Sequence, residues 1–102
     1  SDLYTFIGGG SGNTVSGNNS VVSGGLGNNA SDYGVIGGGK TNTASALYST
    51  VSGGDTNVAS GQYSTISGGR NNTASGNYTF IGGGNQNTNT ISGEFTVIGG
   101  GQ

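Results

Sequence analysis

The side chains that most often carry out chemistry in proteins are sparse in this chain of 102 residues. Histidine and cysteine are absent, so there is no imidazole base and no thiolate nucleophile or ligand. The carboxylates Asp2, Asp32, Asp55 and Glu94 lie far apart in the sequence. Serines are frequent, but none has an evident general base. We therefore expect no catalytic residue, no cofactor and no metal site, and we expect that the protein is not an enzyme.

Glycine-rich runs such as residues 7–12 resemble loops that bind phosphate, but no Gly-Lys-Ser/Thr follows them. Paired glycines also occur in calcium-binding β-roll repeats, where an aspartate follows at a fixed position. Here that position holds asparagine or serine, and Asp55 stands alone. A hard cation needs several oxygen ligands. The runs recur along the whole chain, which favours a structural turn.

The overall composition indicates a fibrous, hydrogen-bonded structure. Glycine accounts for 25 residues, while hydrophobic residues make up only 28% and charged residues 6% of the chain. Lys40 and Arg70 are the only cations and the formal net charge is -2, so we expect no nucleic-acid partner. No apolar run reaches about 18 residues, so we expect no membrane insertion of this segment. A chain with neither a large apolar content nor a high charge must gain its order from repetition.

An internal repeat runs through the whole chain. Its strongest marker is an isoleucine or valine followed by a Gly/Ser-Gly-Gly motif, recurring in steps of 15, 14, 15, 15, 15 and 17 residues. These positions are Ile7, Val22, Ile36, Val51, Ile66, Ile81 and Ile98. An asparagine follows six residues later, at Asn13, Asn28, Asn42, Asn57, Asn72 and Asn87. An aromatic residue opens most repeats, at Tyr4, Tyr33, Tyr48, Tyr63, Tyr78 and Phe95.

These markers define one repeat array over residues 1–102, which we expect to be a fragment of a longer fibre. Six full repeats begin near Tyr4, Asn19, Tyr33, Tyr48, Tyr63 and Tyr78, and a partial seventh begins at Phe95. An Ala-Ser pair or its equivalent recurs in each full repeat, ending with Ile91-Ser92. We place a two-residue insertion within residues 88–90 and a one-residue deletion at the junction of Asp32 and Tyr33.

Each repeat has the pattern of two short strands and two turns. In the fifth repeat, residues 63–66 are rich in aromatic and β-branched residues, and residues 72–75 form the second predicted strand. Glycines at 68, 69 and 76 supply the turns. The sequence therefore predicts an all-β protein, a parallel β-solenoid (β-roll) of about 15-residue coils. At a strand spacing of ~4.8 Å, seven coils give a rod of roughly 33 Å.

Stacked coils turn equivalent positions into ladders. We expect the Ile/Val positions to form the core against small alanines, and the asparagines to bond the backbone of their turn or the next rung. A recognition role for the asparagines is the alternative. Lys40, Asp55 and Arg70 fall on successive rungs of one column, which predicts an exposed charge ladder. The aromatic column is expected to serve packing or an interface, with stacking on sugars as the alternative.

The other side of the first strand is also apolar, which predicts that one chain is not enough. Its outward positions are Phe6, Val21, Val35, Thr50, Thr65, Phe80 and Val97. Burying seven Ile/Val side chains contributes roughly 10–20 kcal/mol. Ordering the chain costs on the order of 100–200 kcal/mol of conformational entropy. Association of several chains would bury the second apolar face.

The repeats at residues 48–61 and 63–76 resemble head repeats of trimeric autotransporter adhesins of the YadA type. Similar repeats occur in fibre shafts of mosaic adhesive trimers and phage-tail-like fibres. The resemblance implies a left-handed β-roll, three chains around one axis, and a location on the bacterial cell surface, outside the cell, or in a virion fibre. This chain departs from the family in its repeat of about fifteen rather than fourteen residues, its Gly-Gly pair and its tyrosine column.

On this basis we expect a structural shaft or head segment of a homotrimeric surface fibre involved in cell adhesion, which projects a binding tip. Its partner would be itself, with a host- or prey-surface ligand beyond that. Two alternatives stay open. One is a self-assembling extracellular filament joined end to end, and the other is an ice-binding β-solenoid with a flat array of threonine and serine.

Overall fold

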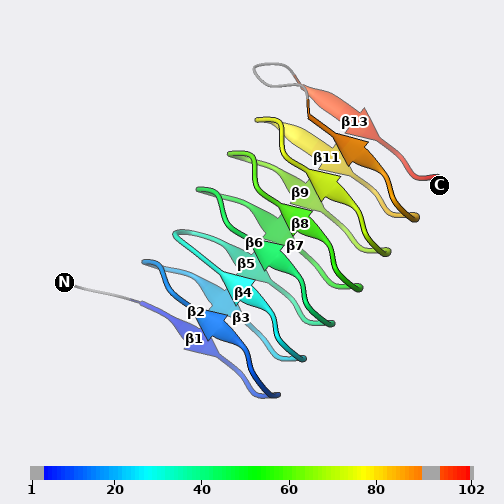
Figure 1. Ribbon diagram of the computed structural model, residues 1–102. Coiled ribbons are helices and arrows are strands. Elements are labelled where there is room, and N and C mark those ends of the chain that lie inside the picture. Colours follow the sequence, from blue (N-terminus) through cyan, green and yellow to red (C-terminus); the bar gives the residue numbers. More distant parts are fainter. Residues whose placement is uncertain (1–3, 91–94, 102) are drawn as a thin grey trace.

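The computed structural model describes residues 4–90 and 95–101, and in this part of the chain it is a parallel β-solenoid without helices (Figure 1). One broad wall, the first sheet, consists of β1 (Phe6–Ile7), β3 (Val21–Val22), β5 (Val35–Ile36), β7 (Thr50–Val51), β9 (Thr65–Ile66), β11 (Thr79–Ile81) and β13 (Thr96–Ile98). The opposite wall, the second sheet, consists of β2 (Thr14–Val15), β4 (Asn29–Ala30), β6 (Thr43–Ala44), β8 (Val58–Ala59), β10 (Thr73–Ala74) and β12 (Thr88–Asn89). The predicted fold class is confirmed.

Successive coils stack in register, so that each strand pairs in parallel with the equivalent strand of the next coil. In the first sheet Val51 pairs with Ile66, and in the second sheet Ala59 pairs with Ala74. The strands keep nearly the same direction from one coil to the next (Figure 1). The molecule measures 34 × 25 × 12 Å. Its long dimension agrees with the roughly 33 Å expected from the strand spacing.

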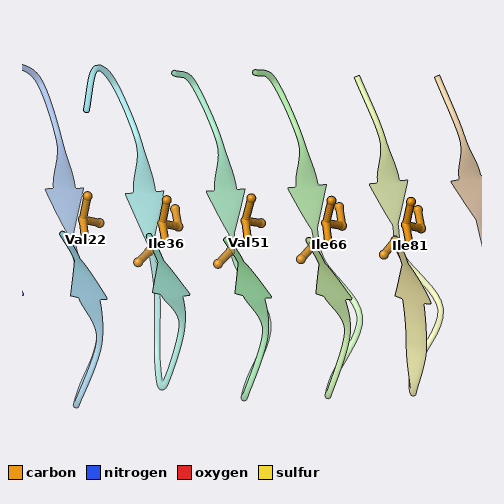
Figure 2. Close-up of a cluster of buried hydrophobic side chains, with 9 residues drawn as sticks. Val22, Ile36, Val51, Ile66 and Ile81 are labelled. Carbon is orange, nitrogen blue, oxygen red and sulfur yellow. The ribbon is translucent and has the colours of Figure 1, made fainter. Parts of the chain in front are cut away.

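The core is a single file of aliphatic side chains between the two sheets. Val22, Ile36, Val51, Ile66 and Ile81 are fully buried, one in each coil (Figure 2). They face a file of buried alanines, which are Ala30, Ala44, Ala59 and Ala74. Because the second sheet contributes mainly alanine methyl groups, the two walls approach closely and the slab is only 12 Å thick. The sequence predicted this pairing of Ile/Val against alanine.

Two members of the expected core file are not fully buried. Ile7 is 46% exposed, so the expectation that it belongs to the core is wrong. The reason is its position in β1, which pairs only with β3 and therefore has a neighbouring rung on one side. Ile98 lies in β13 at the opposite edge of the first sheet and is partly buried.

The strands are shorter than the sequence predicted. The strand expected over residues 63–66 begins at Thr65, and the strand expected over residues 72–75 covers Thr73–Ala74. Tyr63 has a left-handed backbone with φ 59°, which places it in the turn. The Ser64 hydroxyl donates to the Gly61 carbonyl at 2.6 Å, so this buried serine closes the turn.

The one-residue deletion and the two-residue insertion both fall at the same corner of the coil. There the chain leaves the second sheet and enters the next strand of the first sheet. Asn89 pairs with Ala74 at the usual repeat length of 15 residues, whereas Thr96 pairs with Thr79 at a repeat length of 17 residues. The insertion therefore lies between Asn89 and Thr96, not within residues 88–90. The expected Ala-Ser equivalent at residues 91–92 lies outside the described residues.

The shorter coil needs a glycine where four other coils have a buried serine or threonine, at Ser20, Ser49, Ser64 and Thr79. Gly34 occupies that position, and its backbone N–H donates to the Ser31 carbonyl at 2.7 Å. A Cβ on Gly34 would lie 2.8 Å from the carbonyl oxygens of both Ala44 and Ser31. With one residue fewer the chain turns more tightly, and only glycine fits.

Candidate functional surfaces

The asparagine ladder connects each coil to the next through side chains. Its members are Asn13, Asn28, Asn42, Asn57, Asn72 and Asn87. The Asn42 amide donates to the Gly38 carbonyl of its own turn and to the Gly54 carbonyl of the next coil, both at 3.0 Å. Its Oδ1 accepts from the backbone N–H of Asn57 at 2.9 Å. One side chain thus satisfies three backbone groups, which occupies the amide structurally and leaves little of it for a ligand.

This ladder fixes the geometry of the Gly-Gly turn. Asn28, Asn42, Asn57 and Asn72 are fully buried. Gly54 has φ 96°, and a Cβ there would clash with the Gly69 carbonyl and approach the Asn57 amide nitrogen. The spacing of six residues from the Ile/Val position to the asparagine is the same in every coil. The turn tolerates no change in length because the amide must reach carbonyls on two coils.

The charged residues of the column after the Gly-Gly turn are brought together as the sequence predicted. Isolated parallel bridges join Lys40 to Asp55 and Asp55 to Arg70. Lys40 and Arg70 are exposed and Asp55 is partly buried. The Asp55 carboxylate also accepts from the hydroxyl of Thr56 at 2.8 Å. Alternating charge on neighbouring rungs favours this register over one shifted by a coil.

The aromatic column forms a stack of rings at the corner that leads into the first sheet. Tyr33, Tyr48, Tyr63 and Tyr78 follow one another at ring-centroid distances of 4.9, 5.0 and 5.1 Å. Phe95 continues the stack at 5.2 Å with a tilted ring. Tyr4 lies outside it because Asn19 occupies the intervening rung, and is 71% exposed.

Each tyrosine of the stack has an unfavourable backbone conformation. The φ values of Tyr33, Tyr48, Tyr63 and Tyr78 lie between 54° and 61°. A left-handed conformation costs a residue with a Cβ ~1–2 kcal/mol. An aromatic pair contributes ~0.5–1.5 kcal/mol beyond its buried area. Stacking therefore offsets the strain at this corner, and asparagine, which tolerates φ 53° well, replaces tyrosine in the second coil.

The outward side of the first sheet is a continuous and mostly apolar column. We call it the apolar column, and its members are Phe6, Val21, Val35, Thr50, Thr65, Phe80 and Val97, paired rung by rung. Phe6 is 57% exposed, Val97 is 67% exposed and Phe80 is 37% exposed. No charged residue stands at any of these positions. The surface is open to a partner along the length of the sheet.

The outward side of the second sheet carries hydroxyl groups instead. We call it the hydroxyl face, and it has two columns. The first column is Thr14, Asn29, Thr43, Val58, Thr73 and Thr88, paired rung by rung. The second column follows these strands two residues later and is Ser16, Ser31, Ser45, Ser60, Ser75 and Thr90. The serine column is the serine of the recurring Ala-Ser pair, and the fold places it beside the threonine column.

The described residues contain no group of three or more His, Cys, Asp or Glu side chains that could hold a metal ion. The same part of the chain has no helix of the length and apolar character needed to cross a membrane. No protein-family model and no curated protein matches the sequence. Functional conclusions therefore depend on the surfaces themselves.

Proposed function

We propose that this chain is a structural segment of a multi-chain surface fibre, assembled from copies of itself through the apolar column of the first sheet. The exposure of that column carries the proposal. Phe6, Val35, Phe80 and Val97 are 37% to 67% exposed in the single chain, although the fold has enough polar residues to cover the opposite face. Exposed contiguous apolar surface is typical of an interaction site.

The size of the face suits a stable assembly. The slab presents a broad face of about 34 × 25 Å. If another copy covers the whole face, the two surfaces together bury roughly 1,700 Å², within the ~1,200–2,000 Å² of specific interfaces. A closed cyclic arrangement avoids open-ended growth. Three chains, with a left-handed coil, are the arrangement that the resemblance to trimeric adhesins implies.

In such a fibre the segment would act as a shaft or head that holds a binding tip away from the bacterial or virion surface. The ladders suit this role because each coil bonds only to its neighbours, so that length grows by repetition. Adhesion would arise from weak contacts repeated along the rod and among the chains. Nothing in this role needs catalysis or a cofactor.

The decisive experiment is the solution mass of the segment by light scattering after size exclusion, together with circular dichroism. A discrete three-chain particle rich in β structure is the expected result. A folded monomer would contradict the proposal. Open-ended polymers would instead favour the filament, in which coils stack end to end between molecules.

A further inference from the structure

The hydroxyl face of the second sheet is a second surface with different chemistry, and assembly through the first sheet leaves it uncovered. Its two columns present a hydroxyl at ten of twelve positions, the exceptions being Asn29 and Val58. The alanines between the two columns point inward and are buried. Thr14, Thr88, Ser45 and Ser60 are exposed, and Thr43 and Thr73 are partly exposed. The result is a regular array of hydroxyl groups that reaches solvent.

The array is fixed in two dimensions by the backbone. Neighbouring rungs lie ~4.7–4.9 Å apart, and residues two apart along a strand lie roughly 6.6 Å apart. Backbone bonds hold the serine column in the same register, since the N–H of Ser45 donates to the Ala59 carbonyl at 3.1 Å and that of Ser60 to the Ala74 carbonyl at 3.0 Å. The strands keep nearly the same direction through the stack (Figure 1). Threonine side chains are stiff at χ1, so the hydroxyls are held in place before any ligand arrives.

The composition of the face restricts its ligand to something neutral, repetitive and rich in hydrogen-bonding groups. The charged residues of the described chain, Asp32, Lys40, Asp55 and Arg70, all lie in turns or in the column after the Gly-Gly turn. The two columns also contain no aromatic residue on which a sugar ring could stack. A hydroxyl both donates and accepts hydrogen bonds, as water does.

A second observation marks the rim of the same face. Thr41 and Thr56 precede Thr43 and Val58 by two residues and have φ values of 54° and 57°. Equivalent positions hold Gly12 and Gly27, which adopt a positive φ without strain, and Asn71 and Gln86, with φ values of 56° and 62°. A β-branched residue in this conformation is a genuine outlier. Backbone strain of this kind is concentrated at functional positions, where the surrounding structure maintains it. This left-handed turn is common to all six coils, and in the two central ones a threonine places a hydroxyl and a methyl group beside the array at an energetic cost.

We propose that the hydroxyl face binds the ordered water of an ice surface. Ice is a neutral lattice in which every molecule donates and accepts hydrogen bonds, and it repeats in two dimensions as the face does. Individual contacts are weak, but a rigid array engages many of them together. Methyl groups of threonine and Val58 between the hydroxyls add apolar contact that favours ordered over bulk water.

The test measures thermal hysteresis, the gap between melting and freezing in the presence of a seed crystal, on the native protein and on two variants. Thr43→Lys and Thr73→Lys each interrupt the array with a long charged side chain. We expect a measurable gap for the native protein and a reduction of at least about twofold for each variant, because one interruption removes several simultaneous contacts. The matched control is Gln62→Lys, which adds the same charge at an exposed turn and should leave the gap unchanged.

Circular dichroism of each variant verifies that the fold is intact, which is expected because the altered side chains point outward. A native protein without thermal hysteresis would overturn the inference. So would folded Thr43→Lys and Thr73→Lys variants with the native gap. The inference does not depend on assembly through the first sheet, because the solution mass of the same sample reports on that independently.

Discussion

The two broad faces of the solenoid have the same backbone geometry but opposite surface chemistry. Both consist of parallel two- or three-residue strands stacked in register, and both have alternate residues pointing outward. The first sheet presents the apolar column, whereas the second presents hydroxyl groups. A ladder fold repeats one choice of side chain along a whole surface. Each face therefore has one predominant chemistry over its full length, which is why we propose a different role for each.

The largest expected effect comes from the core that both faces share. Ile66→Ala removes a fully buried side chain from the middle of the stack and should lower the free energy of unfolding by about 3–4 kcal/mol. Chemical denaturation followed by circular dichroism measures it. The matched control is Ile7→Ala, the same change in the same column at a residue that is 46% exposed, and it should cost about 1 kcal/mol or less. Equal losses would contradict the described core.

The asparagine ladder also supports both faces equally. Asn57→Ala removes the donor to the carbonyls of Gly53 and Gly69 and the acceptor for the backbone N–H of Asn72, and of these three groups only the Gly69 carbonyl keeps another bond, from the backbone N–H of Asp55. Buried polar groups without partners are costly, so we expect a loss of about 2–3 kcal/mol in the same denaturation experiment. Asn29→Ala, an asparagine on the hydroxyl face, is the control and should change stability by less than about 0.5 kcal/mol. A mild effect of Asn57→Ala would show that the ladder does not hold the coils together.

A glutamate introduced on one face and then on the other tests which face mediates assembly. Phe80→Glu places a charge in the apolar column and should weaken assembly by about 2 kcal/mol per interface, as loss of a central aromatic contact does. Light scattering across a dilution series should then detect dissociation. Thr88→Glu makes the same addition on the opposite face and should leave the mass unchanged. Dissociation by both variants, or by neither, would remove the basis for assigning the interface to the first sheet.

The smallest effect is expected at the corner that joins the two faces. Tyr63→Asn removes two ring contacts, at 5.0 and 5.1 Å, but introduces the residue that the second coil already tolerates at this position. Because lost stacking and relieved backbone strain partly cancel, we expect a net loss of about 1 kcal/mol. Thermal unfolding measures it, and Tyr4→Asn, outside the stack, provides the control. A gain in stability would mean that strain exceeds stacking.

The sequence was sufficient to predict the coil length, the core positions from Val22 to Ile81 and the rung partners of Lys40, Asp55 and Arg70, because a nearly regular repeat leaves one register in which all these markers align. It was insufficient for Tyr63, since an aromatic residue followed by β-branched residues has the pattern of a strand and nothing local indicates a left-handed φ. It also missed that Asn89 pairs with Ala74, because the Ala-Ser marker was matched by residue type and asparagine does not resemble alanine.

The placement of the length changes has a practical consequence for protein engineering. One corner accepts a coil shortened around Gly34 and one lengthened between Asn89 and Thr96, while the register on either side is kept. The opposite corner, with its asparagine amide, keeps a constant length. A peptide grafted between the alanine of one coil and the following strand of the first sheet would therefore be displayed at a defined height on the rod, and several different peptides could be spaced along it at intervals of one coil.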